Sequence, residues 1–117
     1  MAERNETLAL LFTDIEGSTD LLRSLGAGYR ELLAQHRRVL RDAFAAHGGT
    51  VLRGEGDALF VTFDDPSSAI LGAIDGQMAL ANATWPADSR VRVRMGIHVG
   101  EVIIDEDDDY VGLAVHQ

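Results

Sequence analysis

Cysteine is absent from the 117 residues of the sequence, which excludes disulfide bonds, thiolate metal sites and thiol nucleophiles. Long apolar runs are also missing, because no stretch approaches the roughly 18 residues that a membrane helix needs. The N-terminal residues are polar and lack the apolar segment of a secretory signal. These absences predict a cytoplasmic chain that does not insert into a membrane.

Positive charge is scarce, with 10 Lys and Arg residues against 19 Asp and Glu residues and a formal net charge of -9. Nucleic acid binding needs clustered positive charge, so the composition argues against a nucleic acid partner. A small anionic ligand is still compatible with this charge, because divalent cations held among carboxylates reverse the local sign.

Apolar residues make up 46% of the chain, enough for one small core and a single domain over residues 1–117. The residue pattern predicts the order strand, helix, helix, hairpin, helix, hairpin. The strands are expected at 8–12, 50–53, 58–63, 91–99 and 101–104, and the helices at 19–25, 29–47 and about 64–81. We expect Ser18 or Thr19 to cap the first helix and Gly100 to form the turn of the last hairpin. This βααββαββ order predicts an α+β sandwich of the ferredoxin-like kind, with helices packed on one face of an antiparallel-rich sheet.

Two aspartates stand where they could act together. Asp14 follows the first buried strand, and Asp57 lies in the glycine-rich turn between the second and third strands. If these strands are neighbours, both carboxylates reach the same edge and could hold Mg²⁺, which prefers oxygen ligands. From the spacing alone, a helix-capping Asp14 and a simple turn aspartate at Asp57 are equally good interpretations.

Four segments resemble the catalytic domains of class III adenylate and guanylate cyclases, bacterial members in particular. They are FTDIEGST at 12–19, GEGDALF at 54–60, RMGIHVGE at 94–101 and DYVGLAV at 109–115. Together, in this order, they extend over nearly the whole chain. The resemblance implies conversion of ATP (or GTP) to the 3′,5′-cyclic monophosphate and pyrophosphate.

The resemblance also implies the site residues. Two divalent ions, Mg²⁺ or Mn²⁺, are expected between Asp14 and Asp57, with the backbone carbonyl of Ile15 as a further ligand. The phosphate groups are expected to contact the backbone of the following turn, which comprises Glu16, Gly17, Ser18 and Thr19.

Base recognition and transition-state residues are expected at three further positions. Arg53 stands where adenylate-specific members carry lysine, Asp109 stands at the position of its partner, and His116 replaces a catalytic asparagine. Arg53 could equally be a surface arginine paired with an acid, and Asp109 one more solvated acid in its run. The arginine expected four residues after His116 would fall beyond Gln117, so we interpret the chain as a domain lacking its C-terminal part and inactive alone.

In this family two subunits share each active site, so the resemblance implies a homodimer. The leading hypothesis is an adenylate cyclase for intracellular signalling. A non-catalytic nucleotide-binding or dimerisation domain of the same fold is one alternative. A guanylate cyclase is the other, although Arg53 matches neither base preference of the family.

Overall fold

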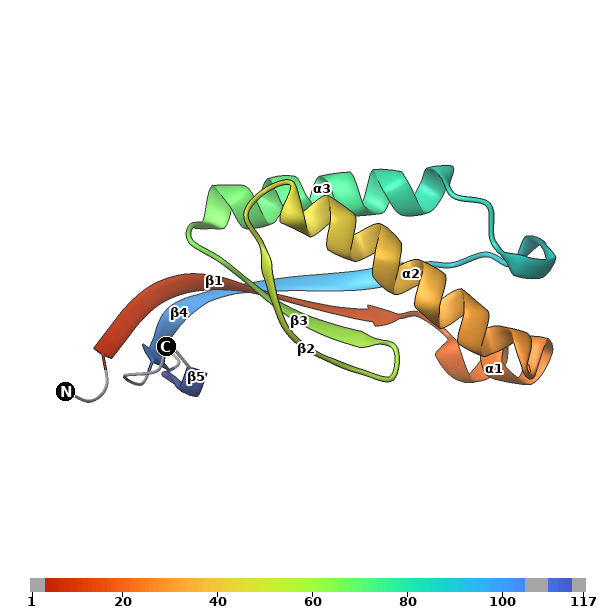
Figure 1. Cartoon of the computed structure of the whole chain (residues 1–117), viewed down its shortest axis with the longest axis horizontal. Coiled ribbons are helices and arrows are strands. Elements are labelled where there is room, and N and C mark those ends of the chain that lie inside the picture. The colour runs from red at the N-terminus through yellow and green to blue at the C-terminus, as the bar shows by residue number, and fades with distance from the viewer. Residues whose placement is uncertain (1–3, 105–109, 115–117) are drawn as a thin grey trace.

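The computed structural model describes residues 4–104 and 110–114. Its elements follow the predicted βααββαββ order, with one additional short 3₁₀ turn before the fourth strand (Figure 1). The strands are β1 (Arg4–Ile15), β2 (Thr50–Glu55), β3 (Ala58–Phe63), β4 (Val93–Ile104) and β5 (Tyr110–Ala114). The helices are α1 (Ser18–Leu25), α2 (Gly28–Ala45), α3 (Pro66–Asn82) and the 3₁₀ turn η1 (Pro86–Asp88).

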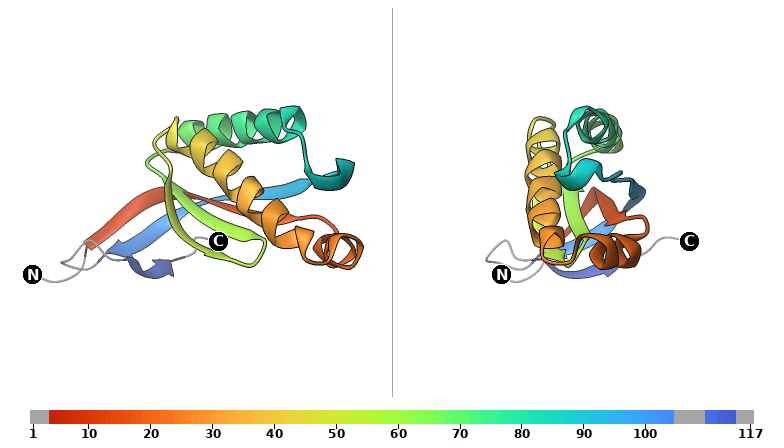
Figure 2. Two further views of the ribbon diagram at one scale, coloured as in Figure 1. Left: turned by 45° about the vertical axis from the view of Figure 1, so that its right-hand side comes forward. Right: turned by 90° about the vertical axis from the view of Figure 1, so that its right-hand side faces the viewer.

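The five strands form one antiparallel sheet in the order β2-β3-β1-β4-β5. β1 is central and pairs with β3 through Thr13 and Leu59, and with β4 along its whole length. Helices α2 and α3 cover one face of this sheet, and α1 lies beyond its end (Figures 1 and 2). This arrangement confirms the predicted ferredoxin-like sandwich and brings the β2–β3 turn beside the C-terminal end of β1.

The predicted turn at Gly100 is wrong. Gly100 is buried within β4 and pairs with Leu8 of β1, so the strand continues to Ile104. Glycine occurs in turns, but inside a strand it can instead mark a place where a neighbouring backbone approaches closely. The second strand of the last hairpin is therefore β5, which begins at Tyr110.

The core lies between the sheet and the two long helices. α2 presents buried residues at helical spacing to the sheet: Leu32, His36, Leu40 and Phe44. The ring of Phe44 meets that of Phe63 on β3 edge to face, with centroids 6.0 Å apart. This contact joins α2 to the sheet at the centre of the core.

Along β1, the side chains alternate between the two faces of the sheet. Leu11 and Ile15 belong to the core beneath the helices, which places Phe12 and Asp14 on the opposite face. The predicted strand at 8–12 is buried on both faces, as expected, because Leu8 and Leu10 are also 5% and 6% exposed. At the C-terminal end of β1, solvent therefore reaches Asp14 and part of Phe12, while Thr13 and Ile15 are buried.

Helix α3 is apolar on more than one side. Its small residues Gly72 and Gly76 are buried, and a Cβ added at Gly76 would lie 3.1 Å from Leu40 of α2. Large apolar side chains on the remainder of α3 are half exposed, namely Ile70, Leu71, Ile74 and Met78. No helix in the described part of the chain has the length and apolar character needed to cross a membrane.

Candidate metal site

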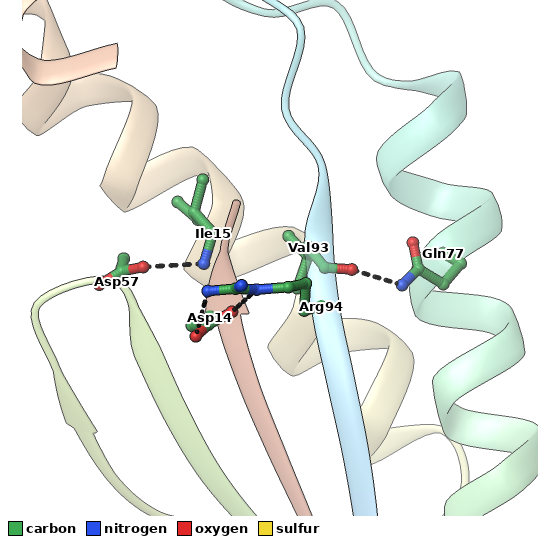
Figure 3. Close-up of polar contacts among 6 residues, drawn as sticks. All are labelled: Asp14, Ile15, Asp57, Gln77, Val93 and Arg94. Carbon is green, nitrogen blue, oxygen red and sulfur yellow. Dashed lines mark hydrogen bonds and ion pairs between the residues drawn. The ribbon is translucent and has the colours of Figure 1, made fainter. Parts of the chain in front are cut away.

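Asp57 reaches β1 through a hydrogen bond to the main chain. Its Oδ2 accepts the N–H of Ile15 at 2.8 Å, across 42 residues of sequence (Figure 3). The β2–β3 turn that carries Asp57 is shaped by Gly56, whose φ of 55° lies in the left-handed region that glycine adopts readily. The predicted turn between the two strands is confirmed but is shorter than expected, because β2 continues to Glu55 and only Gly56 and Asp57 lie between the strands. The Asp57 carboxylate is fixed beside Ile15, the residue that follows Asp14.

Asp14 is paired with Arg94 of β4, its direct neighbour in the sheet. Nε of Arg94 donates to Oδ1 of Asp14 at 2.8 Å, and an η-nitrogen donates to Oδ2 at 3.0 Å (Figure 3). This two-pronged pair raises the pKa of Arg94, first through the hydrogen bonds and then through the attraction of the carboxylate. The Arg94 and Asp14 side chains remain 66% and 44% exposed, so the pair is open to exchange with other ions.

These residues fit a hard divalent cation. The two carboxylates and the neighbouring carbonyl of Ile15 are oxygen donors, which Mg²⁺ and Mn²⁺ prefer. The Arg94 guanidinium already stands in as a cation at Asp14. Within the described residues, no group of three His, Cys, Asp or Glu side chains converges, so the remaining ligands would be main-chain, water or substrate oxygens.

The turn after Ile15 is the segment that the resemblance predicts to contact the phosphate groups. Gly17 has φ 67° and ψ 32° and precedes α1 directly, without a side-chain cap, so the predicted cap by Ser18 or Thr19 is wrong. The first amides of a helix lack intrahelical partners, which leaves those of Ser18 and Thr19 free to meet an anion. The amide of Glu16 is already used, because it donates to the carbonyl of Arg92 at 2.7 Å.

Two aromatic rings lie beside this site on the face opposite the helices. Phe12 and Phe60 meet edge to face with centroids 5.4 Å apart. They line a shallow depression of about 360 Å³ together with Asp14 and Arg94. Arg53 lies above Phe60, with its guanidinium carbon 4.8 Å from the ring centroid. Its contact is therefore a cation–π contact, a role that the sequence did not suggest.

The remaining predicted site residues, Asp109 and His116, lie outside the described residues. Two residues near Asp14 and Asp57, Arg94 and Arg37, have no signal in the sequence that marks them as parts of the site. Only the structure shows that Arg94 donates hydrogen bonds to Asp14 and that Arg37 donates one to the carbonyl of Gly56.

Comparison with known proteins identifies relatives of the whole domain. The family described as the adenylate and guanylate cyclase catalytic domain matches residues 1–110. An adenylate cyclase of Podospora anserina is 30% identical over 94% of this chain, which spans only 6% of that protein.

Solved structures agree on the fold. An adenylate cyclase structure from Trypanosoma brucei has a TM-score of 0.79 at 21% identity, with 91% of this chain and 64% of the other covered. A guanylyl cyclase domain from a fusion protein of Blastocladiella emersonii has a TM-score of 0.82 at 16% identity, with 97% of this chain and 71% of the other covered. At such identities the similarity establishes the fold alone.

Proposed function

Because the chain belongs to the adenylate and guanylate cyclase catalytic domain family, we propose that the longer protein containing it is an adenylate cyclase. It would convert ATP to 3′,5′-cyclic AMP and pyrophosphate for intracellular signalling. The observation that carries this proposal is the hydrogen bond from Ile15 N–H to Asp57, which sets the second carboxylate beside Asp14. Two carboxylates at the C-terminal end of the central strand suit a metal–triphosphate ligand.

The chain's own residues would hold the metal ions and orient the substrate. Asp14, Asp57 and the Ile15 carbonyl would be the ligands of two Mg²⁺ or Mn²⁺ ions. When bound, these ions would supply positive charge to the triphosphate and favour loss of the proton from the ribose 3′-hydroxyl. The amides of Ser18 and Thr19 would receive the terminal phosphates, and Gly17 supplies the positive φ at which the chain turns into α1.

Arg94 has a part in this proposal that follows from its pairing. A divalent ion at Asp14 would compete with the guanidinium, which is exposed and held by a single residue in the described structure. Once released, the guanidinium would lie within the depression beside Asp14, where a triphosphate would add negative charge. Arg94 would therefore exchange the Asp14 carboxylate for the triphosphate, and its positive charge would stay paired.

Base recognition would use the face that carries Phe12, Phe60 and Arg53. The two rings offer apolar area to a purine, and Arg53 offers donors in a fixed plane. Asp109 would accept a hydrogen bond from the exocyclic amine of adenine, and His116 would donate to the reacting phosphate. Because each cyclase site combines residues of two subunits, we propose that the protein acts as a homodimer.

A non-catalytic role of the same fold is the second candidate, and the Asp14–Arg94 pair favours it. A sensor domain that never binds metal would keep this pair closed at all times. The two functions differ in a simple observable, since only the enzyme should release Arg94 when Mn²⁺ and nucleotide are present.

The activity test uses the longer protein with Mn²⁺ and either ATP or GTP, and identifies the product by chromatography. We expect cyclic AMP from the wild type and at least a hundredfold less from Asp14→Asn, because the charged metal ligand is gone. A folded protein that forms no cyclic nucleotide would refute the enzyme proposal, and cyclic GMP alone would make it a guanylate cyclase.

A further inference from the structure

Arg37 of α2 contacts the main chain of the β2–β3 turn from outside the sheet. Its η-nitrogen donates a hydrogen bond to the carbonyl of Gly56, the residue before Asp57. Its Nε lies within reach of Gly54, since a Cβ added there would sit 4.0 Å from that nitrogen. The guanidinium therefore lies beside Gly56 of the turn and Gly54 near the end of β2.

The turn needs such a contact because its own sequence restrains it poorly. Residues 54–56 are exposed and two of them are glycines, which have the widest conformational freedom. The pairing of β2 with β3 is also irregular, with a register shift between Val51 and Arg53. After this shift the two strands pair up to Glu55 and Ala58, so pairing fixes the base of the turn. The exposed Gly56 at its tip has no side chain to pack.

Two contacts from other elements fix the tip of the β2–β3 turn. Arg37 holds the carbonyl of Gly56 from α2, and the N–H of Ile15 holds the carboxylate of Asp57 from β1. These contacts lie on consecutive residues of the turn. Loosening one of them changes the geometry available to the other, because a single peptide unit joins them.

Two titratable groups of α2 lie within electrostatic range of both Arg37 and Asp57. Burial lowers the pKa of His36, and the cation of Arg37 lowers it further whereas Asp57 raises it. Burial raises the pKa of Tyr29, with Asp57 again raising it and Arg37 lowering it.

One atom of Arg37 separates it from an ordinary surface arginine. The residue is half-buried and its hydrogen bond to Gly56 lies at the surface, but its Nε is buried and has no hydrogen-bond partner in the described part of the chain. The adjacent Arg38 is exposed. A residue needed only for solubility would extend into water, whereas Arg37 lies against the β2–β3 hairpin and keeps one polar atom buried, at a free-energy penalty.

We propose that Arg37 is a positioning residue, which preorganises Asp57 for the metal by fixing the β2–β3 turn from α2. The inference rests on the proposed function, because it assigns the purpose of the contact to metal binding. In the free protein, Arg37 holds Asp57 against Ile15 before any ion arrives. Binding then requires less ordering of the turn, which increases the metal affinity.

The test compares Arg37→Met with Arg38→Met in the longer protein. Methionine keeps an unbranched apolar stem at either position and removes the donors. Hydrogen–deuterium exchange of the peptide containing Ile15 reports the Asp57 contact without metal, and electron paramagnetic resonance titration with Mn²⁺ alone reports affinity. We expect faster exchange at Ile15 and about tenfold weaker Mn²⁺ binding in Arg37→Met, as for loss of one charge-assisted hydrogen bond. Arg38→Met should match the wild type in both measurements.

Equal exchange in the two variants would overturn the positioning role, whether or not Mn²⁺ binds. A purely structural arginine would lower the melting temperature and leave exchange at Ile15 unaltered below the transition. If Arg37→Met does not fold, Arg37→Lys replaces it, since lysine retains a donor and should give intermediate exchange. If Arg37→Met exchanges faster than Arg38→Met at Ile15 but the wild type binds no Mn²⁺, the result would instead refute the proposed function.

Discussion

Asp57→Asn separates the two roles that the structure gives to Asp57. An amide oxygen can still accept the N–H of Ile15, which is now bound at 2.8 Å by the carboxylate, but the negative charge is lost. A neutral hydrogen bond contributes about 1 kcal/mol to stability and one to a charged group about 1.5–3 kcal/mol. Because Asp57 is only half-buried, we expect Asp57→Asn to lower the free energy of unfolding by about 1 kcal/mol or less.

Asp57→Ala removes both the acceptor and the charge. We expect it to lower the free energy of unfolding by about 2 kcal/mol, which corresponds to a decrease of roughly 5–10 °C in melting temperature. Both variants should bind Mn²⁺ at least tenfold more weakly than the wild type, because each lacks one carboxylate ligand. Thermal denaturation and Mn²⁺ titration of the longer protein measure these effects. Wild-type Mn²⁺ affinity in Asp57→Asn would refute the assignment of Asp57 as a ligand.

Three other perturbations test separate parts of the structure. Arg94→Gln should bind Mn²⁺ alone more tightly, by several-fold at most because the pair is exposed; weaker binding would show that Arg94 does not compete for Asp14. Burial lowers the pKa of His36 below its ordinary 6.5, so the unfolded state takes up the proton first and stability is lost as the pH falls below about 6.5. His36→Gln should flatten that loss in denaturation curves between pH 5 and 7, and an unchanged slope would assign it to other groups. Gly49→Ala would place a Cβ 2.8 Å from the Phe63 ring and 2.9 Å from the Phe44 carbonyl oxygen; it should cost about 1–3 kcal/mol of stability, and a stability equal to wild type would refute this packing.

The sequence was sufficient for the order of elements. Local signals decided this order: Pro66 opens α3 behind the cap of Asp65. Gly48 adopts φ 76° after α2, as expected for a glycine that stops a helix. Such signals depend only on nearby residues, so they can be read without knowledge of the fold.

Features that depend on distant residues could not be predicted. The pairing of Asp14 with Arg94 spans 80 residues, and nothing in either segment distinguishes Arg94 from the other alternating arginines. Gly100 has the composition of a turn, yet β1 extends to 12 residues and supplies a partner for it. The contact of Arg37 with Gly56 likewise exists only because α2 crosses over the hairpin.

The most direct test of the proposed site is the position of Mn²⁺ itself. Crystals of the longer protein grown with Mn²⁺ and a non-reactive ATP analogue would locate the ions by anomalous diffraction. We expect the ions between the carboxylates of Asp14 and Asp57, near the carbonyl of Ile15, with Arg94 turned away from Asp14. Mn²⁺ bound elsewhere, with the Asp14–Arg94 pair still closed beside the nucleotide, would contradict the assignment of these aspartates as the metal site.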